Sequence, residues 1–316
     1  LYIQGDHFQL SAKNYTADPE KEVAAVRELI REAVDAGFYN IDIDSSTLVD
    51  LSFETLDEQQ KVNYSLCADL TQYVRQVEPE GVTVSLGGEI GEVGGHNSTV
   101  PELHAFMQGY QRETDDLQGI SKISVQTGTS HGGVVLPDGT LADVKVDFVT
   151  LGELSRVSRE EYGLGGAVQH GASTLPPNAF SKFPEVGTVE IHLATNFQNI
   201  VYDNLPQSYV DAAYDYVRQN LKNEWKESQT EEQFIYSSRK KAIGPMKQQW
   251  WDLPADVQTH LGSVLQEQFE FLFDQLGIAN THDFAVSLTP FVKQSRPRPT
   301  EAVEDTELEI ASDLAD

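Results

Sequence analysis

Histidine and acidic residues recur along the sequence at the ends of short β-branched runs, which we predict to be strands. They are Asp6, His7, Asp44, Glu89, His131, His170 and His192. Imidazole and carboxylate groups together form zinc-type sites that keep one coordination position open. The one cysteine, Cys67, excludes a disulfide framework and a Cys-rich zinc module. A metal ion would therefore be held by His and carboxylate side chains, although a single histidine at a strand end is more often structural than a ligand.

Glycines flank two of these histidines. His131 lies within the Gly-rich run 128–133, and His170 opens the run 170–173. Glycine lets the backbone approach a ligand closely, and backbone N–H groups presented at such turns bind anions. The two runs favour a site in which an anionic part of a substrate lies beside the histidines.

Alternating strands and helices must position these residues. We predict strands over residues 1–5, 39–44, 82–86, 121–125, 165–169 and 189–193, with amphipathic helices between them. The first helix has clear ends, with Asp18 as N-cap, Pro19 in the first turn and Gly37 as the stop. Strands separated by helices imply a parallel sheet built from βαβ crossovers.

Six βα units are two short of a closed (β/α)8 barrel. The sequence begins with Leu1 inside a predicted strand. A barrel without two of its strands would expose two edges, so we expect a TIM (β/α)8 barrel whose first two βα units precede residue 1. An open doubly wound sheet is the alternative. In a barrel, the carboxyl ends of all strands meet on one face, where such enzymes have their sites.

The chain divides into three stretches. Residues 1–205 carry the six βα units, and residues 206–293 are predicted to be a helical extension packed on the barrel. Residues 294–316 contain prolines and then many acidic residues, which is typical of a flexible, solvated tail. No linker of low complexity separates the stretches, so a single domain is the better prediction.

Composition and charge limit the partners. Of the 316 residues, 39% are hydrophobic, enough for a sizeable core. The 22 basic and 50 acidic residues give 22 − 50 = −28, which disfavours nucleic acid and anionic membranes as partners. No apolar run approaches 18 residues and no signal peptide is recognisable, so we expect a cytoplasmic protein.

Several of these segments, taken in order, resemble class II, metal-dependent fructose-bisphosphate and tagatose-bisphosphate aldolases. The resemblance rests on residues 5–7 (Gly-Asp-His), 43–46, 88–95, 128–132, 168–173, 187–195 and 239–247. It covers roughly residues 1 to 250 and begins at the family's third barrel strand, in agreement with two missing units. Singly these motifs are weak, and in series they are strong.

The resemblance implies a role for each matching residue. His7, His131 and His170 would hold a catalytic Zn²⁺ or another divalent metal, and Asp44 and Glu89 would hold a second or displaced metal position, with a monovalent cation as a further possibility. Asp6 would be the acid that handles the hydroxyl proton at the bond being broken. The phosphate site would be lined by Gly132, Gly171, Ser173 and Thr195, with Arg239 at a second phosphate.

The activity implied is that of a zinc-dependent lyase of carbohydrate metabolism, such as glycolysis. It would reversibly cleave a ketose phosphate or bisphosphate to dihydroxyacetone phosphate and an aldehyde through a metal-stabilised enediolate. A phosphorylated sugar would be the substrate, and a homodimer or homotetramer the assembly.

The sequence departs from the family at several positions. The usual acidic base after the Gly-Gly pair is replaced by His96 and Asn97, and His96 could serve as the base because imidazole has a suitable pKa. An Asn that contacts the enediolate is replaced by His192, and an Asp two residues later by Ala194. The Lys that commonly follows the His-Gly motif is replaced by the run 134–136. Two alternatives therefore stay open: a non-catalytic stabilising subunit of a tagatose-bisphosphate-type aldolase, or a metal-dependent aldolase or epimerase acting on a different sugar.

Overall fold

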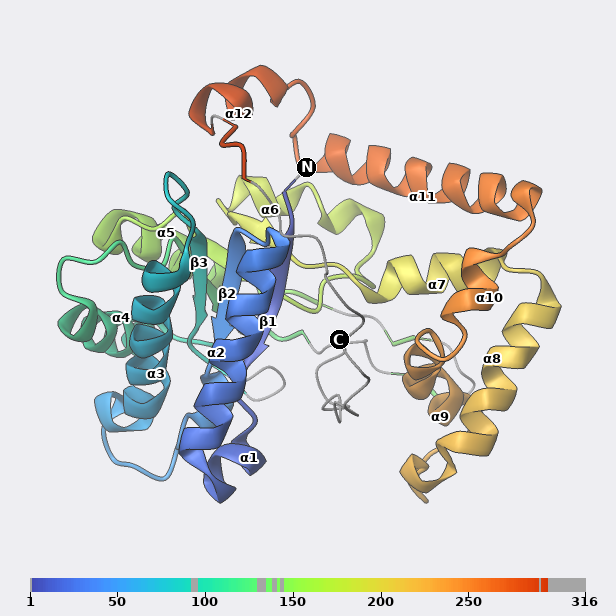
Figure 1. Cartoon of the computed structure of the whole chain (residues 1–316), viewed down its shortest axis with the longest axis horizontal. Coiled ribbons are helices and arrows are strands. Elements are labelled where there is room, and N and C mark those ends of the chain that lie inside the picture. Colours follow the sequence, from blue (N-terminus) through green and yellow to red (C-terminus); the bar gives the residue numbers. More distant parts are fainter. Residues whose placement is uncertain are drawn as a thin grey trace.

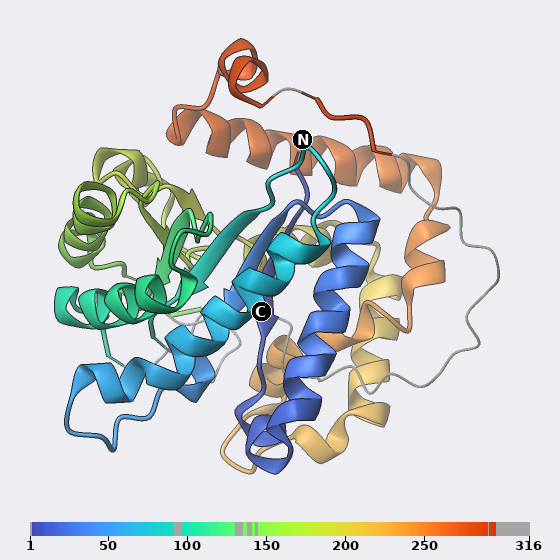
Figure 2. The same cartoon turned by 60° about the vertical axis from the view of Figure 1, so that its left-hand side comes forward.

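A curled parallel sheet forms the centre of the structure, a computed structural model that describes residues 2–91, 96–129, 135–137, 141–142, 145–289 and 291–294. Its strands follow one another in chain order, each pairing in parallel with the next (Figures 1 and 2). They are β1 (Gln4–Gln9), β2 (Asn40–Asp44), β3 (Ser85–Glu89), β4 (Lys122–Val125), β5 (Ala167–Gln169) and β6 (Glu190–Ile191).

The predicted succession of six parallel strands is confirmed, and the alternative of a doubly wound strand order is wrong. The expectation of a complete barrel needs correction, because the sheet formed by the described residues has six strands and stays open as a half-barrel. Whether two further βα units precede residue 1 stays a prediction.

Helices cover the outside of the sheet and extend beyond it. The helices that connect the first five strands are α1 (Ala12–Ala17), α2 (Pro19–Ala36), α3 (Leu56–Val77), α4 (Val100–Thr114) and α5 (Phe148–Tyr162). The later ones are α6 (Lys182–Glu185), α7 (Thr195–Asn204), α8 (Gln207–Asn220), α9 (Glu231–Ser238), α10 (Lys247–Trp251), α11 (Ala255–Gln275) and α12 (His282–Leu288). Among the described residues, no helix combines the length and the apolar character needed to cross a bilayer.

The end signals predicted for the first helix are confirmed in α2. The Asp18 side chain accepts a hydrogen bond from the backbone N–H of Lys21, and Pro19 opens the helix. Gly37 ends it in the left-handed region at φ 90°, where its N–H reaches the carbonyls of the last turn. Such local signals predict helix ends well because they satisfy backbone groups that the helix itself leaves unpaired.

Two strands lie three residues later than predicted. We expected strands over residues 1–5 and 82–86, whereas β1 and β3 end at Gln9 and Glu89. The β-branched runs gave the wrong boundaries because pairing with neighbouring strands extends β1 and β3 through residues of low β-propensity, including Gly87 against β2 and Gly88 against β4. As a consequence Asp6, His7 and Glu89 lie within strands and not in the loops that follow them.

The two faces of the sheet differ in chemistry. Alternate residues such as Ile41, Leu86 and Ile123 are fully buried in a hydrophobic core shared with α2, α3, α4 and α5. The other face, here called the concave face, carries buried charged or polar residues: Asp42, Asp44, Glu89, Lys122, Ser124 and His170. Bulky branched residues usually fill the interior of such a barrel. Polar residues in their place indicate that this interior serves a purpose other than packing.

A second hydrophobic core lies among the C-terminal helices. Its buried residues include Tyr202 of α7, Ala213 and Val217 of α8, and Phe234 of α9. In Figure 1 helices α8, α9 and α10 stand together beside the sheet, while α11 runs across the end of the molecule near the N-terminus. The helical extension predicted for residues 206–293 is thus packed around a core of its own.

Gly87 gives the first test of the concave face. A Cβ at this position would collide with the Asp42 carboxylate and lie 3.1 Å from Cε of Lys122. We expect Gly87→Ala to lower the free energy of unfolding by about 1–3 kcal/mol, because the buried neighbours must shift. Thermal or urea unfolding measures this effect. Gly244→Ala is the matched control, since its Cβ would meet nothing within 4 Å; equal losses in the two variants would contradict the interpretation.

Candidate functional site

A bulge in β1 brings two consecutive residues to the site. Gly5 pairs with Ile41 and Phe8 with Ile43, so Asp6 and His7 together stand opposite the single residue between them, Asp42. An extra residue of this kind bends a strand and redirects its side chains. Without it, neighbouring side chains of a strand would point to opposite faces. The bulge lets both residues reach partners on the concave face.

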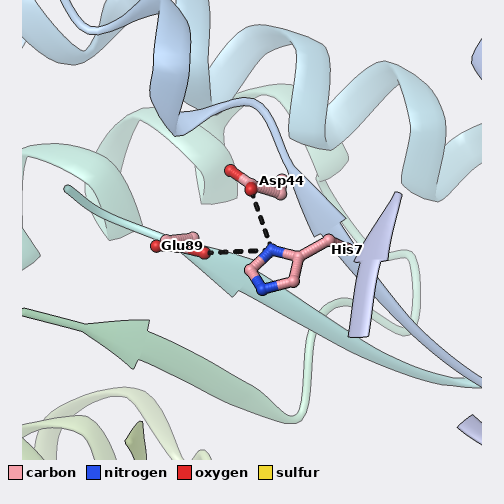
Figure 3. A group of neighbouring side chains, drawn as sticks. All are labelled: His7, Asp44 and Glu89. Atoms are coloured by element: carbon pink, nitrogen blue, oxygen red, sulfur yellow. Dashed lines mark hydrogen bonds and ion pairs between the residues drawn. The ribbon is translucent and has the colours of Figure 1, made fainter. Parts of the chain in front are cut away.

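His7, Asp44 and Glu89 form a group at the carboxyl ends of three adjacent strands (Figure 3). His7 Nδ1 lies 3.0 Å from Asp44 Oδ2 and 4.0 Å from Glu89 Oε2. One ligand atom from each residue lies within 4.8 Å of the others, and both carboxylates are buried. This donor set is suited to a divalent cation, which would supply the positive charge that two buried carboxylates require.

Asp44 is held by several donors. Its carboxylate accepts hydrogen bonds from Gln9 Nε2 at 2.6 Å and from Ser46 Oγ at 2.7 Å, in addition to the His7 contact. Burial alone would raise the pKa of Asp44, but the hydrogen bonds from His7, Ser46 and Gln9 outweigh it and lower that pKa below its ordinary value. Asp44 is therefore ionised and fixed in position.

Two further histidines line the site. The His170 ring lies 4.6 Å from the His7 ring and 4.3 Å from the His192 ring, measured between centroids. His170 Nε2 lies 3.1 Å from Ser124 Oγ. The structure thus brings together His7, His170 and His192. The predicted ligand His131 and the predicted phosphate contact Gly132 lie outside the described residues.

A second polar cluster lies beside the first, and the sequence analysis missed it. Lys122 Nζ lies 2.7 Å from both carboxylate oxygens of Glu190 and 3.1 Å from Asp42 Oδ1. Glu190 Oε1 in turn lies 2.5 Å from His192 Nε2. Ligand atoms of Asp42, Glu190 and His192 also lie within 4.8 Å of one another. We call these four residues, together with Gln4, the lower cluster.

The two carboxylates of the lower cluster have shifted pKa values in opposite directions. Burial raises the pKa of Asp42 to about 6, and the nearby charges of Lys122 and His192 only partly offset this. Burial would also raise the pKa of Glu190, but hydrogen bonds from His192 and Lys122 prevail and lower it to about 2. Glu190 is therefore the permanently charged partner of Lys122.

Asp6 and His192 lie at the boundary between the two groups. Asp6 Oδ2 lies 3.5 Å from His192 Nδ1, and its side chain is 49% exposed, while that of His192 is 7% exposed. An exposed carboxylate beside a buried imidazole can receive a proton from a substrate and remain in contact with a second acid–base group.

His96 has a different neighbourhood. Its Nε2 lies 3.1 Å from Oε1 of the buried Glu102, whose other oxygen accepts from the backbone N–H of Thr99 in the capping box of α4. Both residues line a cavity of about 80 Å³ together with Ile90, Gly91 and Ser98. The described contacts of His96 are thus with Glu102 and not with the His7 group. Asn97 donates to Asp147 Oδ2 at 3.1 Å.

The predicted phosphate contacts meet near the start of α7. Gly171 has φ 66°, and Ser173 Oγ accepts from the backbone N–H of Ala194 at 2.8 Å. Thr195 is the first residue of α7, whose N-terminus has no side-chain cap. Backbone N–H groups at a helix N-terminus suit an anion.

Arg239 lies in the helical extension. Its guanidinium stacks between the rings of Tyr202 and Tyr236, at 4.6 and 4.4 Å from their centroids, and donates to Asn199 Oδ1 at 2.6 Å. The residue is 6% exposed and lines a cavity of about 240 Å³ with Tyr214 and Arg218. Among the residues that the structure describes, Arg239 makes no ion pair.

Apart from His192, the lower cluster was missed because only the carboxyl ends of strands were considered. Gln4, Lys122 and Glu190 are the first residues of their strands, and Asp42 is the middle residue of β2. One sequence signal could have found them: a lysine within an otherwise apolar or small buried strand, Lys122-Ile123-Ser124-Val125, requires a buried counter-charge.

The pKa of Glu190 predicts a pH dependence of stability. This pKa falls from an ordinary value of 4.5 to about 2 in the fold. The ionised Glu190 therefore stabilises the protein fully above pH 4.5, and this contribution is lost as the pH falls toward 2. We expect wild type to exceed Glu190→Gln in free energy of unfolding near pH 6, with a gap that narrows below pH 4.5. Urea unfolding of metal-free protein measures the gap; Glu267→Gln on exposed α11 is the control. A gap independent of pH would contradict the assignment.

Solved structures resemble the chain in fold. A probable tagatose 6 phosphate kinase from Sinorhizobium meliloti 1021 aligns with a TM-score of 0.54 and 15% identity over 90% of this chain and 76% of that chain. Fructose-bisphosphate aldolase from Campylobacter jejuni aligns with a TM-score of 0.48 and 16% identity, over 87% of this chain and 69% of that chain. Fructuronate-tagaturonate epimerase UxaE from Cohnella laeviribosi aligns with a TM-score of 0.49 and 12% identity, over 87% of this chain and 68% of that chain. At these identities the likeness concerns the fold alone.

The sequence itself carries the assignment to a family. A search of curated proteins finds no significant match. Residues 6–249 match the family described as fructose-bisphosphate aldolase class-II, and this span contains Asp6 and His7 of the bulge, the whole His7 group, and the lower cluster except Gln4. The chain therefore belongs to the class-II fructose-bisphosphate aldolase family, whose activity is that of an aldolase-type lyase.

Proposed function

We propose that the protein is a metal-dependent aldolase that reversibly cleaves a ketose phosphate to dihydroxyacetone phosphate and an aldehyde. One observation carries the proposal: within a chain of this family, His7, Asp44 and Glu89 form a buried group whose ligand atoms lie within 4.8 Å of one another. The His170 ring stands 4.6 Å from that of His7.

The residues of this group fit a divalent cation. His7 and His170 would hold it together with His131, and Asp44 and Glu89 would offer a second position for the same or another ion. The donor set of imidazole and carboxylate suits Zn²⁺, and Co²⁺ or Fe²⁺ as well. When bound, the metal supplies Lewis-acid stabilisation of negative charge on the substrate oxygens.

Asp6 would handle the proton of the hydroxyl group at the bond being broken. In the cleavage direction its carboxylate takes the hydroxyl proton, the C–C bond breaks, the hydroxyl carbon becomes the aldehyde, and the electron pair passes to the enediolate of dihydroxyacetone phosphate. The carboxylate is 49% exposed and lies 3.5 Å from His192 Nδ1. His192 stands where the family has the Asn that contacts the enediolate, and here it would act with Asp6 on the hydroxyl proton.

The carbon-bound proton needs a second acid–base group, and we assign it to His96. Glu102 Oε1 at 3.1 Å orients this imidazole. The pair would return a proton to the enediolate carbon and give dihydroxyacetone phosphate. In the reverse direction it removes that proton.

The substrate phosphate would bind at Gly171, Ser173 and the N-terminus of α7, where backbone N–H groups compensate its charge. Gly132 would add to this site. A second phosphate would bind Arg239, which is cationic and has only neutral contacts among the described residues. Both assignments place positive or N–H-rich groups where an otherwise acidic chain needs them.

Hydrogen exchange of dihydroxyacetone phosphate in heavy water tests the function. Proton NMR should show loss of the C3 proton signal with purified protein, and a chelator should stop the loss. This half-reaction needs the metal, the base and the phosphate site, but no aldehyde. Absence of exchange in protein that contains stoichiometric metal would overturn the proposal and favour a non-catalytic, stabilising subunit of an aldolase.

Removal of a metal-binding side chain gives a further prediction. His7→Ala should lower the exchange rate by more than about 100-fold, because losing a ligand exceeds the 10- to 100-fold cost typical of residues that only orient ligands. Metal content measured on the same sample should fall in parallel. His282→Ala on α12 is the control and should exchange at the wild-type rate. Full exchange with unchanged metal content in His7→Ala would exclude His7 as a ligand.

The assignment of the base is tested separately. His96→Ala should slow exchange by about 100- to 10,000-fold, the usual contribution of general acid–base catalysis. Glu102→Gln keeps a hydrogen-bonding group and should slow it less than His96→Ala does. Metal content should stay unchanged in both variants. Wild-type exchange in His96→Ala would mean that another group moves the carbon-bound proton.

A further inference from the structure

Lys122 is a buried cation on the concave face that the proposed reaction does not yet use. The residue is 4% exposed and stands on β4, in the register of Gly87 on β3. Its Nζ lies 2.7 Å from both oxygens of Glu190, 3.0 Å from Gln4 Oε1 and 3.1 Å from Asp42 Oδ1. An ammonium group has three N–H donors. The hydrogen bonds to Gln4 and to both oxygens of Glu190 take all of them, and Asp42 is a partner through charge.

The surroundings are shaped to keep Lys122 in place. Gly87 has no side chain where a Cβ would collide with Asp42 and crowd Lys122. Glu190 and Asp42 provide two carboxylates for one ammonium ion, which offsets the large cost of burying its charge. The amide of Gln4 bridges the same groups, because its Nε2 donates to Glu190 Oε1 at 2.5 Å and to Asp42 Oδ2 at 3.1 Å.

The carboxylate of Glu190 determines which ring nitrogen of His192 carries the proton. A carboxylate oxygen can only accept, so the 2.5 Å contact between Glu190 Oε1 and His192 Nε2 requires the proton on Nε2. Gln4 Nε2 also lies 3.1 Å from His192 Nε2, but it donates to the carboxylates of Glu190, Asp42 and Asp6. In the neutral ring of His192, Nδ1 is then the acceptor nitrogen. This atom is buried, makes no hydrogen bond to the described residues, and lies 3.5 Å from Asp6 Oδ2.

We propose that Lys122 is a positioning residue: its ammonium group fixes Glu190, and Glu190 holds His192 with the proton on Nε2 and the acceptor Nδ1 facing Asp6. The inference rests on the proposed aldolase function and deepens it. Asp6 and His192 act on the hydroxyl proton of C–C cleavage, whereas the exchange of dihydroxyacetone phosphate does not involve that proton. Lys122 should therefore matter for bond making and breaking and not for the exchange half-reaction.

The first measurement needs no turnover. Long-range ¹H–¹⁵N NMR of metal-free protein labelled in histidine distinguishes the two imidazole tautomers, and His192→Asn identifies the signal. We expect the Nε2–H form in wild type and in Lys122→Arg, and a mixture of both forms in Lys122→Met. An Nδ1–H form in wild type, or an unchanged Nε2–H form in Lys122→Met, would overturn the proposal whatever the protein catalyses.

The second measurement compares two reactions of the same protein samples. Lys122→Met should slow the condensation of dihydroxyacetone phosphate with glycolaldehyde by about 10- to 100-fold in kcat, the usual loss for a group that orients another. Its KM for dihydroxyacetone phosphate and its exchange rate should stay within about threefold of wild type. Lys122→Arg should restore condensation in part, and Lys182→Met on exposed α6 should have no effect. Loss of both reactions in Lys122→Met would mean a general structural role and would contradict the proposal.

Controls keep the test decisive. If Lys122→Met does not fold, the double variant Lys122→Met with Asp42→Asn is used in place of the single variant. It keeps the net charge of the lower cluster unchanged. Lys122→Met combined with His192→Asn should condense no more slowly than His192→Asn alone, because both changes act through one residue. A second equivalent of Zn²⁺ bound by wild type and lost in His192→Asn would show that a metal, and not Lys122, occupies the lower cluster. Absence of exchange in wild type would refute the aldolase proposal alone, since the tautomer measurement still decides the role of Lys122.

Discussion

A charged side chain moved from water into a protein interior loses its hydration, so the carboxylates on the concave face of this sheet can persist only beside partners. Asp44 has His7, Ser46 and Gln9, and Glu190 has Lys122 and His192. Because each buried charge needs such a partner, the residue types that can occupy these strand positions are restricted. This need also explains Gly87, since the ion pair beneath it leaves no space for a side chain.

The same requirement applies to two neighbouring groups of buried charges: an upper group, which is the His7 group, and the lower cluster. In the upper group, His7, Asp44 and Glu89 bring one imidazole and two carboxylates together, a donor set that suits a metal ion. In the lower cluster the ammonium of Lys122 already stands between Asp42 and Glu190. The lower cluster thus carries its cation on a side chain of the protein itself.

Sequence patterns predicted the parts that local chemistry determines. The ends of α2 followed from Asp18, Pro19 and Gly37, and the parallel order followed from helices between β-branched runs. The approach of His7, Asp44 and Glu89 followed from the rule that carboxyl ends of parallel strands converge. These features depend on a few neighbouring residues or on the order of strands and helices, and both can be predicted from a single sequence.

The remaining parts depend on contacts between distant segments. The bulge at Asp6 and His7 depends on the register of β1 against β2, and no residue type in β1 predicts it. Lys122 meets Glu190 across 68 residues of sequence, and His96 meets Glu102 because α4 begins between them. Strand register and loop direction are tertiary properties, so a prediction restricted to the carboxyl ends of strands named His7, Asp44 and Glu89 but not Lys122 and Glu190.

The two hydrophobic cores have a consequence for substrate length. His7 and Asp44 are supported by the core of the sheet, whereas Arg239 is supported by the core of the C-terminal helices. Helix α7, which begins four residues after β6, is the covalent connection between them. A small change in how α7 leaves the sheet would alter the distance between His7 and Arg239 without changing the surroundings of either. Under the proposed function, selectivity for substrate length and the chemistry of cleavage could then evolve independently.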